Sequence, residues 1–555
     1  MNLAIGKPVD KPGDVNATRI ATFTRFILPF AYRLEKSAGK TPSLYYQVNP
    51  ASDLSFVKRR KYFTRETGHI LYDRACWLDM CPAWEDTMWG KGDVEVTLRG
   101  QRFFLGMLPP RITLFEAGTG RDGGLLPPSG VSEGVKTTQT GFLQVDVYFP
   151  QKEDQAPELD DLLLLNEFFR YFHLPWEEHE KIFKSNFGRI PAGYPDGKPV
   201  GELGQLECYF ERWANLLELP VVHGDVQYRL FPRSWSDAAR AWCYSSDDGR
   251  EHWQIYADNR TYVWTVVFLD RGGATLQACF SPRSEQDRCL QAHRFGHWIR
   301  LLNVDAPEFD ARKNRYRSAR HTNDRITAFE QRWARERTYG RWQEAGTWYG
   351  FCYHGSAVLS PAGEYRVFSP ARSYYSDTLL LLFYVRLSLF RFSRTLSEIV
   401  EDPKERSQEL REKLSDLRKI FARFTILYRY PLVSNQQQML EMYELMRGAL
   451  DIEPLFREVQ QEIESTHEFL EAVEATRLSR VANMLAGLGL PMAAGGLTAA
   501  LFSMENNNIW AWLRSATGYH LNGDLVVQAL LVALVTLATY VLVRVMSRRN
   551  DGGNG

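Results

Sequence analysis

The sequence predicts an α+β domain followed by a long stalk helix and two C-terminal transmembrane helices. Strand-like and helix-like apolar patterns are mixed within the first 340 residues, which predicts the α+β domain. Apolar residues then recur at steps of three, four, seven or eight between 452 and 481, as on one face of a helix. Two uncharged stretches follow at 485–502 and 525–543. Each is close to the roughly 20 residues that a helix needs to cross a bilayer.

Composition limits the function classes. The chain has 555 residues, which is too long for one ordinary domain, and 67 basic residues balance 67 acidic ones. We therefore expect no nucleic-acid partner. The seven cysteines are scattered, which favours reduced thiols over a disulfide scaffold. No nucleophile elbow, phosphate loop or paired-carboxylate motif is found, so we expect neither an enzyme nor an organic cofactor.

Residues 1–340 are predicted to form a large cytosolic domain whose role the sequence does not indicate. Strands are expected in "VEVTLRGQRFFLGM" and "FLQVDVYF", and a hairpin is expected where "WQIYA" and "TYVWTVVFL" are joined by Asp258, Asn259 and Arg260. Helices are expected in "ELDDLLLLNEFFRYF" and over 318–338. The many aromatic residues are attributed to the core of this domain.

Two patterns in this domain could bind a ligand. "GTGRDG" at 118–123 has the glycine spacing of a dinucleotide site, but "LLPPSG" follows where a helix is required, which favours a loop. A zinc site is conceivable because Cys289, His293 and His297 share helical spacing and Cys279 lies nearby. The nine residues between the cysteines do not match a usual zinc knuckle, which favours structural roles.

The stalk at 451–481 carries eight acidic side chains against three arginines. Such a run is consistent with a solvated helix face. A divalent-cation sensor is the alternative, because hard cations need several carboxylate oxygens brought together. The candidate sensing residues are Asp451, Glu453, Glu458 and Glu462.

The two apolar segments differ in composition. The first, at 482–504, is rich in glycine and alanine, whereas the second, at 524–546, is rich in leucine and valine. Small residues let helices approach closely, so we expect the first segment to face protein and the second to face lipid. A pore would then need several copies of the chain. Candidate pore-lining residues are Asn483, Ala493 and Leu497, and a plain membrane anchor is the alternative.

Charges next to these segments predict their orientation. Arg477 and Arg480 precede the first segment, and Arg544, Arg548 and Arg549 follow the uncharged stretch of the second, the last two of them in the tail at 547–555. The connecting loop at 505–523 has only Arg514 and His520. Because positive charge accumulates on the cytoplasmic side, both termini should be cytoplasmic and the loop external.

The C-terminal 210 or so residues resemble the CorA-type metal ion transporters. The stretch "ATRLSRVANMLAGLGLPMAAGGLTAALFSMEN" is similar to the stalk and first membrane helix, which in that family closes with a Gly-Met-Asn signature. Here Ser503 replaces the glycine, Met504 matches, and Glu505 replaces the asparagine, with Asn506 one residue later. Within 341–450, "GTWYGFCYHGSAVLS" and "SYYSDTLLLLFYVRLSLFRFSRTLSEI" are similar to the strand and helices that precede the stalk.

The resemblance implies a homopentamer in a bacterial inner membrane, with the first membrane helix lining a pore for Mg²⁺ or another divalent cation. It also implies that Ser503, Met504 and Glu505 ring the external mouth. A carboxylate ring would attract divalent ions more strongly than an amide ring. CorA-like proteins also act in bacterial defence, so a membrane effector gated by a nucleotide-type second messenger is an alternative. A membrane-anchored binding domain is a further one.

Overall fold

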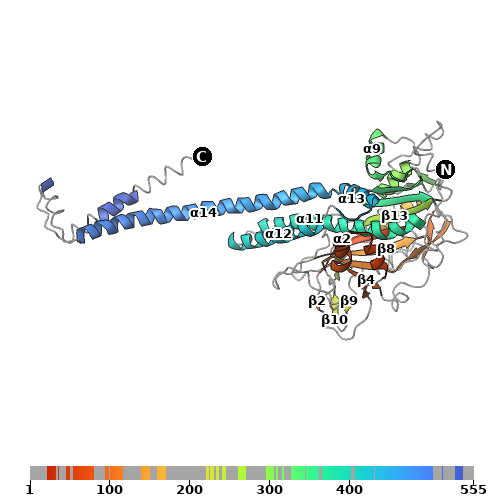
Figure 1. The fold of residues 1–555 in the computed structure, drawn as a ribbon, viewed down its shortest axis with the longest axis horizontal. Coiled ribbons are helices and arrows are strands. Elements are labelled where there is room, and N and C mark those ends of the chain that lie inside the picture. Colours follow the sequence, from red (N-terminus) through yellow and green to blue (C-terminus); the bar gives the residue numbers. More distant parts are fainter. Residues whose placement is uncertain are drawn as a thin grey trace. The chain divides into compact units, whose positions relative to one another are not determined.

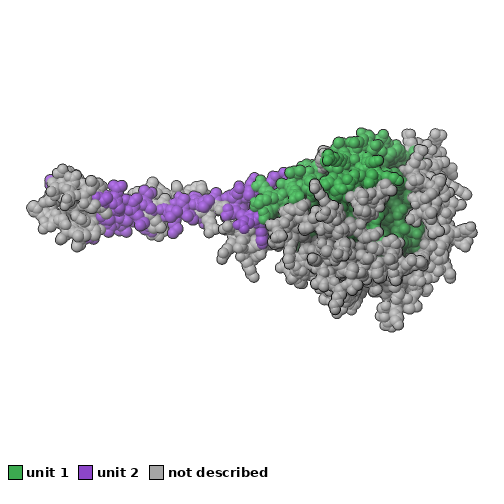
Figure 2. All heavy atoms as spheres, turned by 60° about the horizontal axis from the view of Figure 1, so that its bottom comes forward, with its two compact units in different colours: residues 1–403, 415–459 green, residues 404–414, 460–555 purple. Residues whose placement is uncertain are grey.

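The computed structural model describes a defined part of the chain. The described residues are 22–32, 35–36, 46–49, 54–80, 94–98, 101–116, 139–149, 159–170, 221–223, 226–229, 233–236, 241–244, 261–269, 295–305, 308–310, 315–317, 327–343, 345–361, 365–401, 407–429, 432–503, 515–516, 530 and 532–541. They fall into two compact units, 1–403 with 415–459 and 404–414 with 460–555, which Figure 2 colours separately.

A large mixed sheet organises the first unit (Figure 1). Among the described residues its strands run in the order β16-β17-β18-β13-β1-β8-β7-β4-β3-β9-β10-β2, with β6 pairing β8 and β5 pairing β6. The strands are β1 Phe23–Tyr32, β2 Glu35–Lys36, β3 Tyr46–Asn49, β4 Cys76–Met80, β5 Val94–Leu98, β6 Gln101–Met107, β7 Arg111–Leu114, β8 Gln139–Tyr148, β9 Val221–His223, β10 Val226–Arg229, β13 Tyr262–Leu269, β16 Thr338–Tyr339, β17 Trp348–Phe351 and β18 Gly355–Pro361.

Two short strand pairs and a set of helices complete the described structure. The pairs are β11 Arg233–Ser236 with β12 Ala241–Tyr244, and β14 Glu308–Asp310 with β15 Arg315–Arg317. Residues 295–303 are also helical. The other helices are α1 Leu54–Arg60, α2 Arg65–His69, η2 Ile70–Arg74, α4 Leu159–Arg170, α9 Ala328–Glu336, α10 Tyr365–Pro370, η3 Ala371–Tyr375, α11 Ser376–Glu401, α12 Ser407–Tyr428, α13 Gln437–Ala449 and α14 Ile452–Ser503.

Helices cover both faces of the sheet at β1. Successive side chains of a strand point to opposite faces. The Thr24 hydroxyl donates to Asn166 Oδ1 of α4 at 2.8 Å. The next residue, Arg25, donates from Nη1 to the Ser376 hydroxyl of α11 at 2.7 Å. The sheet therefore lies between α4 and α11 at β1, and residues 23–27 of this strand are all buried.

Helix α14 begins at a break in the chain direction. Asp451, which separates α13 from α14, has a φ of 51°, a left-handed conformation that cannot continue a right-handed helix. The first apolar residues of α14, Ile452, Phe456 and Val459, are buried in the sheet-bearing unit. The ring of Phe456 stacks on Phe421 of α12 with centroids 5.4 Å apart. These contacts hold the start of the long helix.

The expected mixed domain and long C-terminal helix are confirmed. The predicted strands correspond to β5, β6, β8 and β13, and "ELDDLLLLNEFFRYF" contains α4. The helix expected over 318–338 was wrong in extent, because Thr327 caps α9 by accepting from the backbone N–H of Glu330. Thr338 belongs to β16. The motif at 118–123 and the residues 253–260 lie outside the described residues.

Candidate functional site

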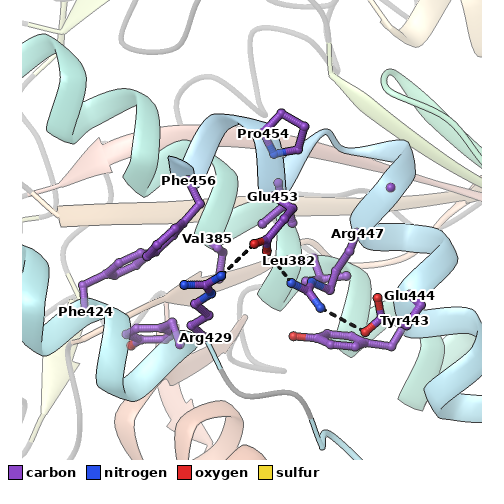
Figure 3. Close-up of a pocket in the computed structure, with 13 residues that line it drawn as sticks. Leu382, Val385, Phe424, Arg429, Tyr443, Glu444, Arg447, Glu453, Pro454 and Phe456 are labelled. Carbon is purple, nitrogen blue, oxygen red and sulfur yellow. Dashed lines mark hydrogen bonds and ion pairs between the residues drawn. The ribbon is translucent and has the colours of Figure 1, made fainter. Parts of the chain in front are cut away.

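A cavity of about 550 Å³ lies where α14 begins (Figure 3). Helices α11, α12, α13 and α14 all contribute to its wall. Its volume is in the range of sites for small organic molecules. The lining residues combine aromatic rings, aliphatic side chains and four charged groups: Leu382, Val385, Phe424, Tyr428, Arg429, Tyr443, Glu444, Arg447, Gly448, Ile452, Glu453, Pro454 and Phe456.

Two arginines converge on one carboxylate in this cavity (Figure 3). Arg429, just after α12, donates from Nη2 to Glu453 Oε1 at 2.7 Å. Arg447 of α13 donates from Nη2 to Glu453 Oε2 at 2.7 Å and from Nη1 to Glu444 Oε1 at 2.9 Å. Arg457, one turn along α14, is 3.8 Å from Glu453. Glu453 therefore joins the first turn of α14 to two other parts of the unit.

Aromatic rings lie beside both arginines. The Arg429 guanidinium carbon is 4.5 Å from the centroid of the Phe456 ring, and that of Arg447 is 5.7 Å from the Tyr443 ring. Both distances allow a cation–π attraction. Burial lowers the pKa of Arg447, but Tyr443 and Glu444 are the main neighbours that raise it, and the net shift is upward. Arg447 therefore stays charged at any physiological pH.

The four candidate sensing acids lie in different surroundings. Asp451 is exposed and precedes α14, whereas Glu453 is held by arginines. Glu458 is exposed and Glu462 is half-buried. Within the described part of the chain, no group of three or more His, Cys, Asp or Glu residues is placed to hold a metal ion. Divalent sensing by these residues stays a prediction.

Of the four zinc candidates, the structure describes His297 only. Its ring is buried, and Nδ1 lies 3.4 Å from Arg300 Nη1 and 3.8 Å from Asp160 Oδ1. Cys279, Cys289 and His293 lie outside the described residues. Cys76 and Cys352 are buried free thiols, and burial raises the pKa of each to about 12.

The second half of α14 is the part suited to a membrane. By length and composition, Ile452–Thr498 is a candidate membrane span, and its most apolar window is only 13% buried. Asn483, Ala493 and Leu497 are all exposed in the single chain. Ser503 is the last residue of α14, and Met504, Glu505 and Asn506 lie outside the described residues.

A second apolar helix lies against this part of α14. It comprises Val532–Val541, which is too short as described to span a membrane alone. A Cβ added at Gly495 would lie 2.5 Å from Thr536 Oγ1, whereas one added at Gly496 would meet nothing within 4 Å. The glycine at 495 therefore permits a close approach of the two helices.

The cavity and its two arginines were not predicted from the sequence. The spacing of Phe421, Phe424 and Tyr428 could have indicated one apolar face of α12. Nothing in the sequence indicates that Arg429 and Arg447 meet at Glu453, because their distance along the chain says nothing about distances between folded helices.

Comparisons with protein-family models, with curated proteins and with solved structures find no match to this chain.

Proposed function

We propose that the chain is a homo-oligomeric membrane channel for divalent cations, with Mg²⁺ as the first candidate ion. The observation that supports it most is the continuity of α14. This single helix has 52 residues and runs from the cavity residues Ile452 and Glu453 to Ser503. At 1.5 Å per residue it is roughly 78 Å long.

The burial along α14 changes in a way that suits this role. Its first turns are buried in the sheet-bearing unit, as described for Ile452 and Phe456. Farther along, Leu485, Leu490 and Leu497 are 60–66% exposed in the single chain. Apolar side chains that are exposed over several turns need lipid or another copy of the helix to cover them. A continuous helix that begins in the sheet-bearing unit and ends in a membrane could couple ligand or ion binding in that unit to opening of the pore.

Glu505 would give such a channel its selectivity. If five copies surround an axis, their Glu505 carboxylates meet at the external mouth and concentrate divalent cations there. The resemblance to CorA-type transporters supports this arrangement, together with a bacterial inner membrane and cytoplasmic termini. Sensing of internal Mg²⁺ by Asp451, Glu458 and Glu462 belongs to the same proposal. Glu453 would have to leave its arginines before it could bind a metal ion.

Ion uptake into liposomes tests the proposal. The full chain is reconstituted into liposomes loaded with a Mg²⁺-sensitive dye, and Mg²⁺, Co²⁺, Ni²⁺ and Na⁺ are added outside in turn. We expect divalent uptake well above that of protein-free liposomes. Absence of divalent uptake, despite full incorporation in the predicted orientation, would favour a membrane anchor instead.

The cavity favours a second candidate, a membrane effector that opens when a ligand binds its sheet-bearing unit. A nucleotide-type messenger is the alternative that the resemblance to CorA-like proteins implies. The observation in its favour is that Glu453, in the first turn of α14, lines a cavity of ligand size. In the uptake assay such an effector would stay closed until its ligand is supplied.

A further inference from the structure

We propose that the cavity at the start of α14 binds a small organic anion with a planar apolar body. The anionic group would be a phosphate or a carboxylate and would contact Arg429 and Arg447. The ring would lie against the aromatic wall. In this proposal the Glu453 carboxylate is an internal anion that occupies the same two arginines when no ligand is present.

The charges of the cavity support an anionic head group. Arginine carries five N–H donors in a planar fork that matches carboxylate and phosphate oxygens. Among the described residues, Arg429 uses only Nη2 for a side-chain hydrogen bond, the one to Glu453. Arg447 is bound on both Nη atoms by two carboxylates. A ligand anion could thus accept hydrogen bonds from Arg429 and take the place of the Glu453 carboxylate on Arg447.

The walls of the cavity support a planar body. Four aromatic rings line it, together with the aliphatic side chains of Leu382, Val385 and Ile452; the rings are those of Phe424, Tyr428, Tyr443 and Phe456. Phe424 and Tyr428 stack on each other with centroids 5.1 Å apart. A flat ring can bury apolar area against such a wall at little cost in conformational entropy.

Glu453 gives the site a link to α14. It lies in the first turn, and its two arginines tie that turn to α13 and to the end of α12. When a ligand takes these arginines, the turn loses two charge-assisted hydrogen bonds. That regulatory step rests on the proposed channel function, whereas binding itself does not.

Calorimetric titration of the full chain in detergent tests binding. The probes are 1-naphthyl phosphate and 1-naphthoate, with 1-naphthol and inorganic phosphate as fragments that lack one half of the proposed ligand. We expect at least one naphthyl anion to bind with one site per chain, roughly tenfold or more tighter than either fragment, which is about 1.4 kcal/mol. Binding of 1-naphthyl phosphate but not of 1-naphthoate would narrow the ligand class to organic phosphates. Equal binding of 1-naphthol, or no binding of either anion, would overturn the proposal.

Variants of opposite effect make the test specific. Arg447→Gln should weaken binding of the naphthyl anion about tenfold by removing a charged donor, and Arg429→Gln should also weaken this binding. Glu453→Gln should strengthen binding of the anion about tenfold, because the competing carboxylate is gone. Arg418→Gln and Glu468→Gln change the same charges at exposed positions outside the cavity and should leave affinity unchanged.

Thermal unfolding of the same samples checks that each variant is folded. If both arginine variants fail to fold, the gain of affinity in Glu453→Gln remains decisive. Unchanged or weaker binding by a folded Glu453→Gln would mean that Glu453 only clamps the helix, and would overturn the proposal. Because no ion flux is measured, a chain that conducts nothing can still pass this test, and a conducting chain can fail it.

Discussion

Asp146 is a buried carboxylate held between two arginines on the face of the sheet that α11 covers. Arg25 Nε lies 2.6 Å from Oδ1, and its Nη2 donates to Oδ2 at 2.9 Å. Arg372 of η3 lies 3.7 Å away. Burial opposes ionisation of Asp146, but the attraction of Arg25 and Arg372 outweighs it and lowers the pKa of the carboxyl below its ordinary value.

Asp146→Asn should therefore destabilise the fold by about 3–5 kcal/mol at neutral pH, because it removes the carboxylate that forms the ion pair with the buried Arg25. The lowered pKa means that the carboxylate stabilises the fold above its unfolded pKa of about 3.9 and that this contribution is lost as the pH falls through the folded pKa. Chemical denaturation at pH 7 and at pH 3 measures both effects. When the pH is lowered from 7 to 3, the free energy of unfolding should fall less for Asp146→Asn than for the wild type.

Asp416→Asn is the matched control for this change. Asp416 forms an exposed ion pair with Lys419, which should contribute less than about 1 kcal/mol. If the two variants have the same free energy of unfolding at pH 7, the pair of Arg25 and Asp146 does not stabilise the fold as described.

Single residues show how far the sequence can predict a site. The acidic stretch that contains Glu453 is visible in the sequence, and so is its position at the start of a helix. Its two arginine partners are not, because Arg429 and Arg447 reach Glu453 only after the chain turns at Asp451 and α12 packs beside α14. The sequence therefore shows an acidic residue at the start of the helix, but it does not predict that two arginines bind Glu453.

At the scale of elements, the contact between Gly495 and Thr536 is open to a direct test. Gly495→Val should destabilise the packing of α14 against Val532–Val541 by about 1–3 kcal/mol, because the added side chain has no space there. Gly496→Val adds the same side chain where nothing lies within 4 Å, so helix propensity changes equally in both. Thermal unfolding in detergent compares them. Equal melting temperatures would show that the two helices do not approach at Gly495.

Elements with strong periodicity were predictable, and long-range pairings were not. The apolar patterns of β8, β13 and α4 indicated strand or helix, because the side chains that must be buried recur with the period of the element. The predicted helix ran to residue 338, whereas α9 ends at Glu336, because a helical pattern does not locate the last residue of a helix. The parallel pairing of β13 with β18, from Val263 opposite Gly355 onward, joins segments about 90 residues apart and has no local signal.

At the scale of the whole molecule, the proposed oligomer predicts which residues of neighbouring chains meet. Leu497 and Leu534 are about equally exposed in the single chain, at 65% and 66%. We expect Leu497 to face other copies and Leu534 to face lipid. Leu497→Cys should therefore give an oxidative crosslink between chains in membranes, and Leu534→Cys should not. The unsubstituted chain measures the background crosslinking of the native cysteines. If Leu534→Cys crosslinks and Leu497→Cys does not, the proposed arrangement of the two helices is reversed.

The central proposal is that the end of α14 forms the mouth of a cation channel, and divalent uptake by Glu505→Lys tests it most directly. In a ring of five chains, this change replaces five converging negative charges with five positive ones, which repel divalent cations. Uptake of Mg²⁺ is measured in dye-loaded liposomes at matched incorporation, with Glu468→Lys as a control for the same charge change at an exposed stalk position that is not a candidate sensing residue. We predict that Glu505→Lys abolishes most of the uptake and that Glu468→Lys retains it. Equal uptake by wild type and Glu505→Lys would contradict the proposed channel mouth.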